Sequence, residues 1–205
     1  MTSAAPIALI DYGAGNVPSV ERALQKLGAT CKRVTRPSEL ADARAVILPG
    51  VGHYAAIIRA LDENHLRGAL LDAITRGIPF LGICLGLQAL YSASEEAATF
   101  AGLSLFPGSV HSLPTSVKLP HMGWNRLRIQ RNSKLLASLD ESDYFYFAHT
   151  YAASGASEEV VATCKHGATF SAVLEHNNIF ATQFHPEKSG AAGARLLHNF
   201  VSLAA

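Results

Sequence analysis

The sequence predicts an α/β protein with a doubly wound, largely parallel sheet and an added antiparallel layer in its C-terminal half. In the first half, short apolar runs alternate with segments whose apolar residues recur at helical spacing, the order expected for a parallel sheet with crossover helices. After about residue 95, proline and glycine are frequent and strand-like runs follow one another without long helices, which indicates antiparallel pairing. The 205 residues contain no repeat and no linker-like stretch, so we expect one domain over 1–205.

The first half begins with a predicted strand at 7–10 that runs into a glycine-rich turn. We expect a helix after this turn, capped by Asn16, with Val20, Leu24 and Leu27 on one face and Gly28 as its terminator. The elements predicted next are a strand at 30–34, a helical turn from Pro37, a strand at 45–48, a helix over 66–77 that buries Leu66, Leu70 and Ile74, and a buried strand over 78–83.

In the second half of the sequence we predict several strands and one final helix. That helix covers 190–203 and packs Leu197, Phe200 and Val201. The strands are expected at 110–113, 126–129, 144–147, 160–164, 170–174 and 179–184.

Composition narrows the class of protein. Hydrophobic residues make up 49% of the chain and charged residues only 16%, which predicts a large core and some covered surface. The formal net charge is +1 with scattered basic residues, so neither nucleic acid nor membrane is expected as a partner. The three cysteines are far apart, no stretch is long enough to cross a membrane, and no secretory leader is recognisable. We therefore expect a reduced, cytoplasmic protein without metal or cofactor.

The segment IPFLGICLGLQ at 78–88 reads as a buried strand, a sharp turn at Cys84 and the start of a helix. Glycines at 82 and 86 leave backbone room around the turn, as in a nucleophile elbow with cysteine in place of serine. The following helix would direct its N-terminal amides at the sulfur and favour the thiolate. The alternative is a small buried cysteine in an ordinary turn.

A base for such a thiol is offered by His185, which follows the predicted strand at 179–184. If Pro186 keeps the backbone extended, Glu187 projects to the same side and can hold one imidazole nitrogen as donor. An isolated His-x-Glu pair is more often structural, but this pair is predicted at the carboxyl end of a strand, on the same rim as Cys84.

A third rim element is the loop Gly50-Val51-Gly52, directly after the predicted strand at 45–48. Its amides, together with the amide of Leu85, would suit an oxyanion hole. Taken alone, this loop could equally be an ordinary turn between strand and helix.

The order of these three elements resembles class I glutamine amidotransferases, and the resemblance extends over essentially the whole chain. Five longer blocks narrow it to the family of glutaminase subunits of imidazole glycerol phosphate synthase. They are DYGAGN at 11–16, PGVGHY at 49–54, LPHMGWN at 119–125, FYFAHTY at 145–151 and QFHPEKS at 183–189.

The resemblance implies hydrolysis of glutamine by a triad of Cys84, His185 and Glu187, with Gln88, Thr150 and Tyr151 binding the substrate. It also implies a heterodimer with a (β/α)8-barrel cyclase subunit, which uses the ammonia to make imidazole glycerol phosphate and AICAR in histidine biosynthesis. Free ammonia would be protonated in water, which is a physical reason to expect such a partner. The residues expected to face the partner are Asn16, Pro120, His121, Met122, Trp124 and Lys188; for Trp124 the alternative is an aromatic plug in the interior.

Other functions remain open at this level. A glutaminase subunit of another ammonia-channelling enzyme, such as pyridoxal phosphate synthase, would share the triad but not the PGVG and PHMGWN blocks. A non-catalytic stress protein with a cysteine elbow would not need His185 and Glu187. A serine hydrolase is disfavoured because GxSxG is absent, and Cys164-Lys165-His166 is interpreted as strand because no further metal ligands lie at suitable spacing.

Overall fold

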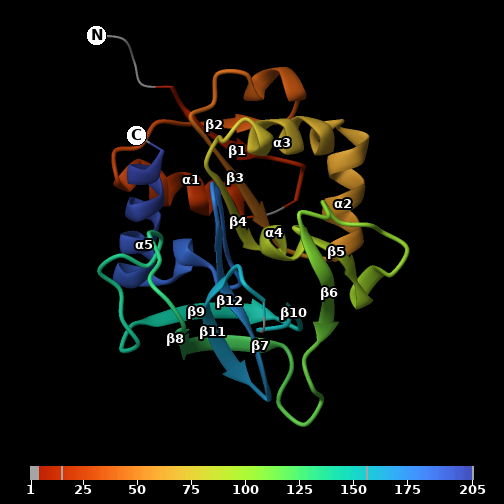
Figure 1. The fold of residues 1–205 in the computed structure, drawn as a ribbon. Helices are drawn as coiled ribbons and strands as arrows, with labels where there is room; N and C mark the ends of the chain where they lie inside the picture. Colours follow the sequence, from red (N-terminus) through yellow and green to blue (C-terminus); the bar gives the residue numbers. More distant parts are fainter. Residues whose placement is uncertain (1–4, 15, 156, 205) are drawn as a thin grey trace.

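An eight-stranded sheet forms the centre of the molecule in the computed structural model, which describes residues 5–14, 16–155 and 157–204 (Figure 1). Its strand order is β2-β1-β3-β4-β13-β12-β11-β8. The strands are β1 (Ile7–Ile10), β2 (Cys31–Val34), β3 (Ala45–Gly50), β4 (Phe80–Cys84), β13 (Ile179–Thr182), β12 (Ala168–His176), β11 (Val160–His166) and β8 (Arg128–Ile129).

The five strands from β2 to β13 are parallel, as the doubly wound prediction requires. All residues of β1, β3, β4 and β13 are buried, which explains why these strands read as continuous apolar runs rather than alternating ones. The register pairs Gly50 at the end of β3 with Cys84 at the end of β4, so the Gly50–Gly52 loop and the elbow begin side by side.

Helices cover both faces of this sheet. On one face, α1 (Val17–Lys26) and α5 (Gly190–Leu203) share an apolar cluster with residues such as Leu24 and Phe200. On the other face, α2 (Tyr54–Glu63) and α3 (Leu66–Thr75) bury residues such as Ile57 and Leu70. Short helical turns lie at η1 (Pro37–Leu40), η2 (Glu95–Ala97) and η3 (Pro186–Lys188). Within the described residues, no helix is both long and apolar enough to span a bilayer.

Helix α2 was not among the predicted elements, although its apolar residues do recur at helical spacing. Tyr54, Ile57, Ile58 and Leu61 are buried, and His53 caps the helix by accepting the Ala55 amide at 3.1 Å. Histidine is not one of the usual capping residues, so the start of this helix lacked its ordinary signal.

The antiparallel half extends the same sheet and adds two smaller ones. Strands β12, β11 and β8 continue the central sheet in antiparallel pairing beyond β13. The smaller sheets contain β5 (Tyr91–Ser94), β6 (Phe106–Ser112) and β10 (Tyr151–Ala153), and the pair β7 (His121–Arg126) and β9 (Tyr144–His149). A strand over 121–126 was not among the predicted elements, yet His121–Arg126 pair residue by residue with β9.

The elbow between β4 and α4 (Leu85–Gln88) is packed against β3 without room for added side chains. A β-carbon on Gly86 would lie 2.0 Å from the Leu48 carbonyl oxygen, and one on Gly50 would lie 2.6 Å from Cβ of Leu85. The helix after the elbow is therefore a single turn held against β3 by close backbone contact. It is shorter than the sequence suggested, so its dipole contributes less at Cys84 than a long helix would.

We expect Gly86→Ala to lower the free energy of unfolding by about 1–3 kcal/mol, because β3 and α4 must separate to admit the methyl group. Thermal or urea denaturation measures this change. The control is Gly68→Ala in α3, where a β-carbon meets nothing within 4 Å, and where alanine in a helix interior is expected to be neutral or stabilising. Equal stability of the two variants would contradict the close packing of the elbow.

Candidate active site

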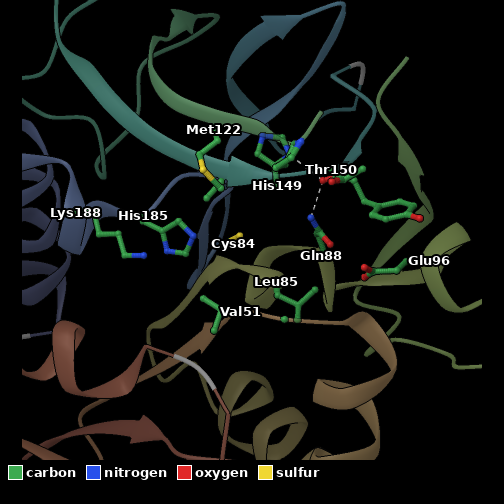
Figure 2. A pocket seen from close by; sticks show the side chains of 14 residues that line it. Val51, Cys84, Leu85, Gln88, Glu96, Met122, His149, Thr150, His185 and Lys188 are labelled. Carbon is green, nitrogen blue, oxygen red and sulfur yellow. Dashed lines mark hydrogen bonds between the residues drawn. The ribbon is translucent and has the colours of Figure 1, made fainter. Parts of the chain in front are cut away.

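A pocket of about 350 Å³ opens at the carboxyl ends of β3 and β4 (Figure 2). It brings together residues from the elbow, the Gly50–Gly52 loop, the β9–β10 segment and the segment after β13. Its lining residues are Val51, Gly52, Cys84, Leu85, Gln88, Glu96, Pro120, Met122, Ala148, His149, Thr150, Tyr151, His185 and Lys188.

Cys84 occupies the turn itself, with φ 54° and ψ −103°. A positive φ is uncommon for a residue with a side chain, costs on the order of 1–3 kcal/mol, and is typical of functional sites. The residue is only 5% exposed, yet it lines the pocket, and Gln183 Nε2 lies 3.6 Å from its sulfur. The backbone therefore has the conformation of a nucleophile elbow.

His185, Glu187 and Asn16 form a chain of side chains behind the sulfur. His185 Nδ1 lies 2.9 Å from Glu187 Oε1, and Asn16 Nδ2 donates to the same oxygen at 3.0 Å. The expected extended backbone at Pro186 was wrong: Pro186–Lys188 is a helical turn, which brings Glu187 back to the imidazole. The pairing of His185 with Glu187 that the sequence suggested is nevertheless present.

The electrostatics of this chain favour a protonated imidazole. Burial by itself lowers the pKa of His185, but the neighbouring Cys84 sulfur and the Glu187 carboxylate outweigh burial and raise this pKa to about 10. Burial raises the pKa of Glu187, but the bonds from His185 and Asn16 outweigh it, so that this pKa is lowered overall. An imidazolium between a sulfur and a carboxylate is the arrangement that activates a thiol and supplies a proton to a leaving group.

Asn16 was expected to cap α1 with its side chain, and this expectation was wrong. It occupies the N-cap position, but the side chain makes no capping hydrogen bond and instead reaches Glu187 from 171 residues away in the chain. Asn16 is half-buried in this contact with Glu187, and its predicted place at a partner interface stays a prediction.

We expect Asn16→Leu to lower kcat about tenfold, because Glu187 loses one of the two bonds that orient its carboxylate. The free energy of unfolding should change little, since no capping bond is lost. The matched control is Ser19→Ala on the same helix, where the hydroxyl only accepts a bond from exposed Arg22. An Asn16→Leu enzyme with unchanged kcat would argue against any role of Asn16 in orienting Glu187.

Of the predicted oxyanion residues, Figure 2 labels Val51 and Leu85, which lie below Cys84 and His185 in that view. Val51, Gly52 and Leu85 line the pocket, whereas Gly50 is buried at the end of β3 and packs against Leu85. Gly52 has φ +97°, a conformation that a residue with a side chain rarely adopts. The Gly50–Gly52 loop and the elbow thus lie side by side at the pocket.

The far end of the pocket carries the predicted substrate residues and two that the sequence reasoning missed. Gln88, Thr150 and Tyr151 line it together with Glu96 and His149. Glu96 Oε2 accepts the Tyr54 amide at 2.8 Å, which fixes the carboxylate at the N-terminus of α2. No spacing in the sequence links Glu96 to the elbow, and only the missed helix α2 explains its position.

The predicted partner-facing residues divide into two groups. Pro120, Met122 and Lys188 line the pocket mouth, and Met122 and Trp124 are 65% and 54% exposed on β7. His121 differs: its side chain is 5% exposed because alternate residues of β7 face inward, so it does not present its ring to a partner. The alternative of a buried plug is wrong for Trp124.

No group of three or more histidine, cysteine, aspartate or glutamate side chains is arranged for a metal ion in the part of the chain that the structure describes. Cys164 and His166 lie in β11.

Comparison with known proteins agrees with this geometry. The family model described as "Glutamine amidotransferase class-I" matches residues 8–203. A protein of Moorella thermoacetica named "Imidazole glycerol phosphate synthase subunit HisH" is 45% identical over 199 residues, covering 97% of this chain and 95% of that protein. One of the same name from Methanothermobacter thermautotrophicus is 48% identical over 197 residues, covering 96% and 98%.

Solved structures share the fold at low sequence identity. A structure titled "Crystal structure of glutamine amidotransferase" superposes with a TM-score of 0.77 at 19% identity, covering 97% of this chain and 98% of that one. The structure of PurLQS from Thermotoga maritima gives a TM-score of 0.75 at 20% identity, with the same coverage of 97% and 98%. By the family match and by its relatives, the chain belongs to the class-I glutamine amidotransferase family and, within it, to the HisH subunits of imidazole glycerol phosphate synthase.

Proposed function

We propose that this protein hydrolyses glutamine to glutamate and ammonia, as the glutaminase subunit of imidazole glycerol phosphate synthase in histidine biosynthesis. The observation that carries the proposal is Cys84 at a positive-φ elbow, next to the imidazole of the His185–Glu187 pair, at a pocket of about 350 Å³. The names of its relatives supply the biosynthetic context.

In the proposed mechanism, the Cys84 thiolate attacks the side-chain carboxamide of glutamine. The oxyanion that forms is held by the backbone amide of Leu85 and an amide of the Gly50–Gly52 loop. His185 gives its proton to the departing ammonia, which leaves a glutamyl thioester on Cys84. His185 then takes a proton from water, and the resulting hydroxide attacks the thioester carbonyl. The C–S bond breaks, glutamate is released, and Cys84 leaves as thiolate beside the protonated His185, which restores the starting pair.

The substrate backbone would lie at the other end of the pocket. One oxygen of Glu96 is committed to the Tyr54 amide, which leaves the other available to the α-ammonium group of glutamine. Thr150, Tyr151 and Gln88 line the same pocket as Glu96, and Figure 2 shows Gln88 between Cys84 on one side and Glu96 on the other, with Thr150 above it. This arrangement would select an amino acid over a simple amide.

A partner that receives the ammonia is supported by the surface around the pocket mouth. Within the described chain, the large hydrophobic side chains that are exposed are Met122, Trp124 and Tyr144, and all three belong to the β7–β9 pair. Exposed aromatic and methionine side chains gathered on one element are typical of protein interfaces. We propose that this pair contacts a (β/α)8-barrel cyclase subunit in a heterodimer, with Pro120 and Lys188 at the mouth that opens towards it.

The test is glutamate release from glutamine by the purified chain, alone and with the barrel cyclase. We expect slow release alone and faster release in the complex, because a water-excluding interface completes the site. Absence of glutamate in both assays would overturn the proposal. Stimulation by a pyridoxal phosphate synthase core but not by the cyclase would instead assign the chain to that other channelling enzyme.

A further inference from the structure

Two buried histidines connect β7 and β9 to the substrate end of the pocket. His121 and His149 are 5% and 6% exposed, and His121 Nδ1 lies 3.1 Å from His149 Nε2. His149 Nδ1 lies 2.9 Å from the carbonyl oxygen of Tyr151. Neither residue belongs to the proposed triad of Cys84, His185 and Glu187.

The direction of these hydrogen bonds is fixed at the Tyr151 end. A carbonyl oxygen can only accept, so His149 Nδ1 carries the hydrogen. In neutral His149 the Nε2 atom is then an acceptor, and His121 Nδ1 must donate to it. By the same reasoning His121 Nε2 is left as an acceptor.

At the other end of this series of hydrogen bonds, Asn125 independently requires His121 Nε2 to be an acceptor. Asn125 Nδ2 lies 3.2 Å from both His121 Nε2 and the Lys165 carbonyl oxygen, while Asn125 Oδ1 accepts the Arg126 amide at 2.9 Å. The side-chain amide is therefore oriented by backbone groups and donates one hydrogen to His121. Donor and acceptor roles agree along the whole series from Asn125 through His121 and His149 to Tyr151.

Packing holds the two rings in place and keeps them neutral. His121 stacks on His166 with ring centroids 4.2 Å apart, and the Nε2 atom of His166 donates to the Lys118 carbonyl at 2.8 Å. Burial, with His166 nearby, lowers the pKa of His121 to about 4. Burial also lowers the pKa of His149 to about 3, although the Tyr151 carbonyl opposes this shift. A proton added to His149 Nε2 would face the donor His121 Nδ1, and one added to His121 Nε2 would face the donor Asn125 Nδ2.

The series ends on the side chain of Gln88. Gln88 Nε2 donates to the same Tyr151 oxygen at 2.7 Å and to Gln183 Oε1 at 3.2 Å, which uses both of its hydrogens. Gln88 Oε1 is consequently left as an acceptor in the pocket, and no donor among the described residues bonds to it (Figure 2).

We propose that His149, supported by His121, is a positioning residue for substrate binding. It fixes the Tyr151 carbonyl, and that carbonyl orients Gln88 so that its Oε1 accepts an N–H of bound glutamine. This inference rests on the proposed glutaminase function, and it assigns a role in binding rather than in the chemistry at Cys84.

The test compares His149→Leu with His149→Asn, two side chains of nearly the same shape. Asparagine Nδ2 can still donate to the Tyr151 carbonyl from about the position of His149 Nδ1, whereas leucine cannot. Two probes are used on the purified chain: the glutamine analogue 6-diazo-5-oxo-L-norleucine and iodoacetamide, which both alkylate cysteine. The leucine variant should need an analogue concentration about threefold to tenfold higher to reach its half-maximal labelling rate. A change of this size is on the order of that expected for the loss of one hydrogen bond. The asparagine variant should stay within about twofold of wild type.

Controls separate this role from a general effect on folding. Labelling by iodoacetamide, which does not occupy the amino-acid end of the pocket, should be unchanged in both variants, and their thermal midpoints should be similar. If the leucine variant does not fold, His121→Leu and His121→Asn provide a second pair with the same expected difference. The inference would be overturned if the analogue concentration for half-maximal labelling rose equally in the leucine and asparagine variants, or if it changed in neither. A wild-type chain that reacts with iodoacetamide but never with the analogue would overturn the proposed function as well.

Discussion

Replacing Cys84 by alanine is expected to reduce glutamine hydrolysis by about 10⁴-fold or more. The sulfur lies where the elbow, His185 and the oxyanion amides meet, and no other cysteine, serine or threonine in the described chain lines the pocket except Thr150 at its far end. Glutamate formation by the complex with the cyclase is the measurement. Because alanine removes one atom from a residue that is already strained, the fold should be retained.

Cys31→Ala is the matched control for this experiment. Cys31 is half-buried at the start of the edge strand β2, where the parallel strands begin, whereas the pocket lies where they end; burial raises its pKa. Its replacement should leave both glutamine hydrolysis and labelling by the glutamine analogue unchanged. Hydrolysis that persists in Cys84→Ala at more than a few per cent of wild type would overturn the thioester mechanism.

The parallel half of the fold could be predicted because its strands are buried on both faces. Ile7–Ile10 and Phe80–Cys84 appear in the sequence as uninterrupted apolar runs, and parallel strands place their carboxyl ends on one rim. Cys84 and the Gly50–Gly52 loop meet at that rim for this reason. His185 joins them because β13 also pairs with β4 in parallel, although its segment belongs to the half in which antiparallel pairing was predicted. This is why a large part of the candidate site was foreseen without any contact being known.

Residues whose position depends on contacts distant in the chain could not be foreseen. Glu96 is held by the first amide of α2, and Asn16 reaches Glu187 across 171 residues. His121 lies in a strand that pairs with β9, so its neighbours Met122 and Trp124 face outward while it faces inward. A segment containing proline and glycine at 120 and 123 reads locally as a loop, and only pairing with β9 makes it a strand.

The charge of Glu187 can be tested separately from its hydrogen bonds. Glu187→Gln retains an oxygen that can accept from both His185 Nδ1 and Asn16 Nδ2, and it removes the negative charge. We expect kcat to fall about 10²-fold, within the range usual for general acid–base catalysis. The Asn16 donor disfavours rotation of the new amide group, because rotation would bring two donors together at this point.

The pH dependence of kcat/KM gives a second readout for Glu187→Gln. The pKa of His185 is raised to about 10, in part by Glu187, and the imidazolium is the acid that protonates the departing ammonia. Removing the carboxylate lowers this pKa, so the alkaline limb of kcat/KM should move to lower pH by roughly one unit or more. Because the proton is needed, activity is lost as pH rises through the pKa, and the variant loses it earlier than wild type.

A double variant decides whether Glu187 acts through its negative charge or only by holding the His185 ring in position. In Glu187→Gln combined with Asn16→Leu, nothing opposes rotation of the amide group, and its nitrogen can turn towards His185 Nδ1. His185 would then have to place its hydrogen on the nitrogen that faces Cys84, as in the wrong tautomer of a catalytic triad. The loss of activity should exceed the product of the two single losses. Simple multiplication of the losses, with an unshifted alkaline limb, would mean that Glu187 only supports the position of the ring and that its charge is not used.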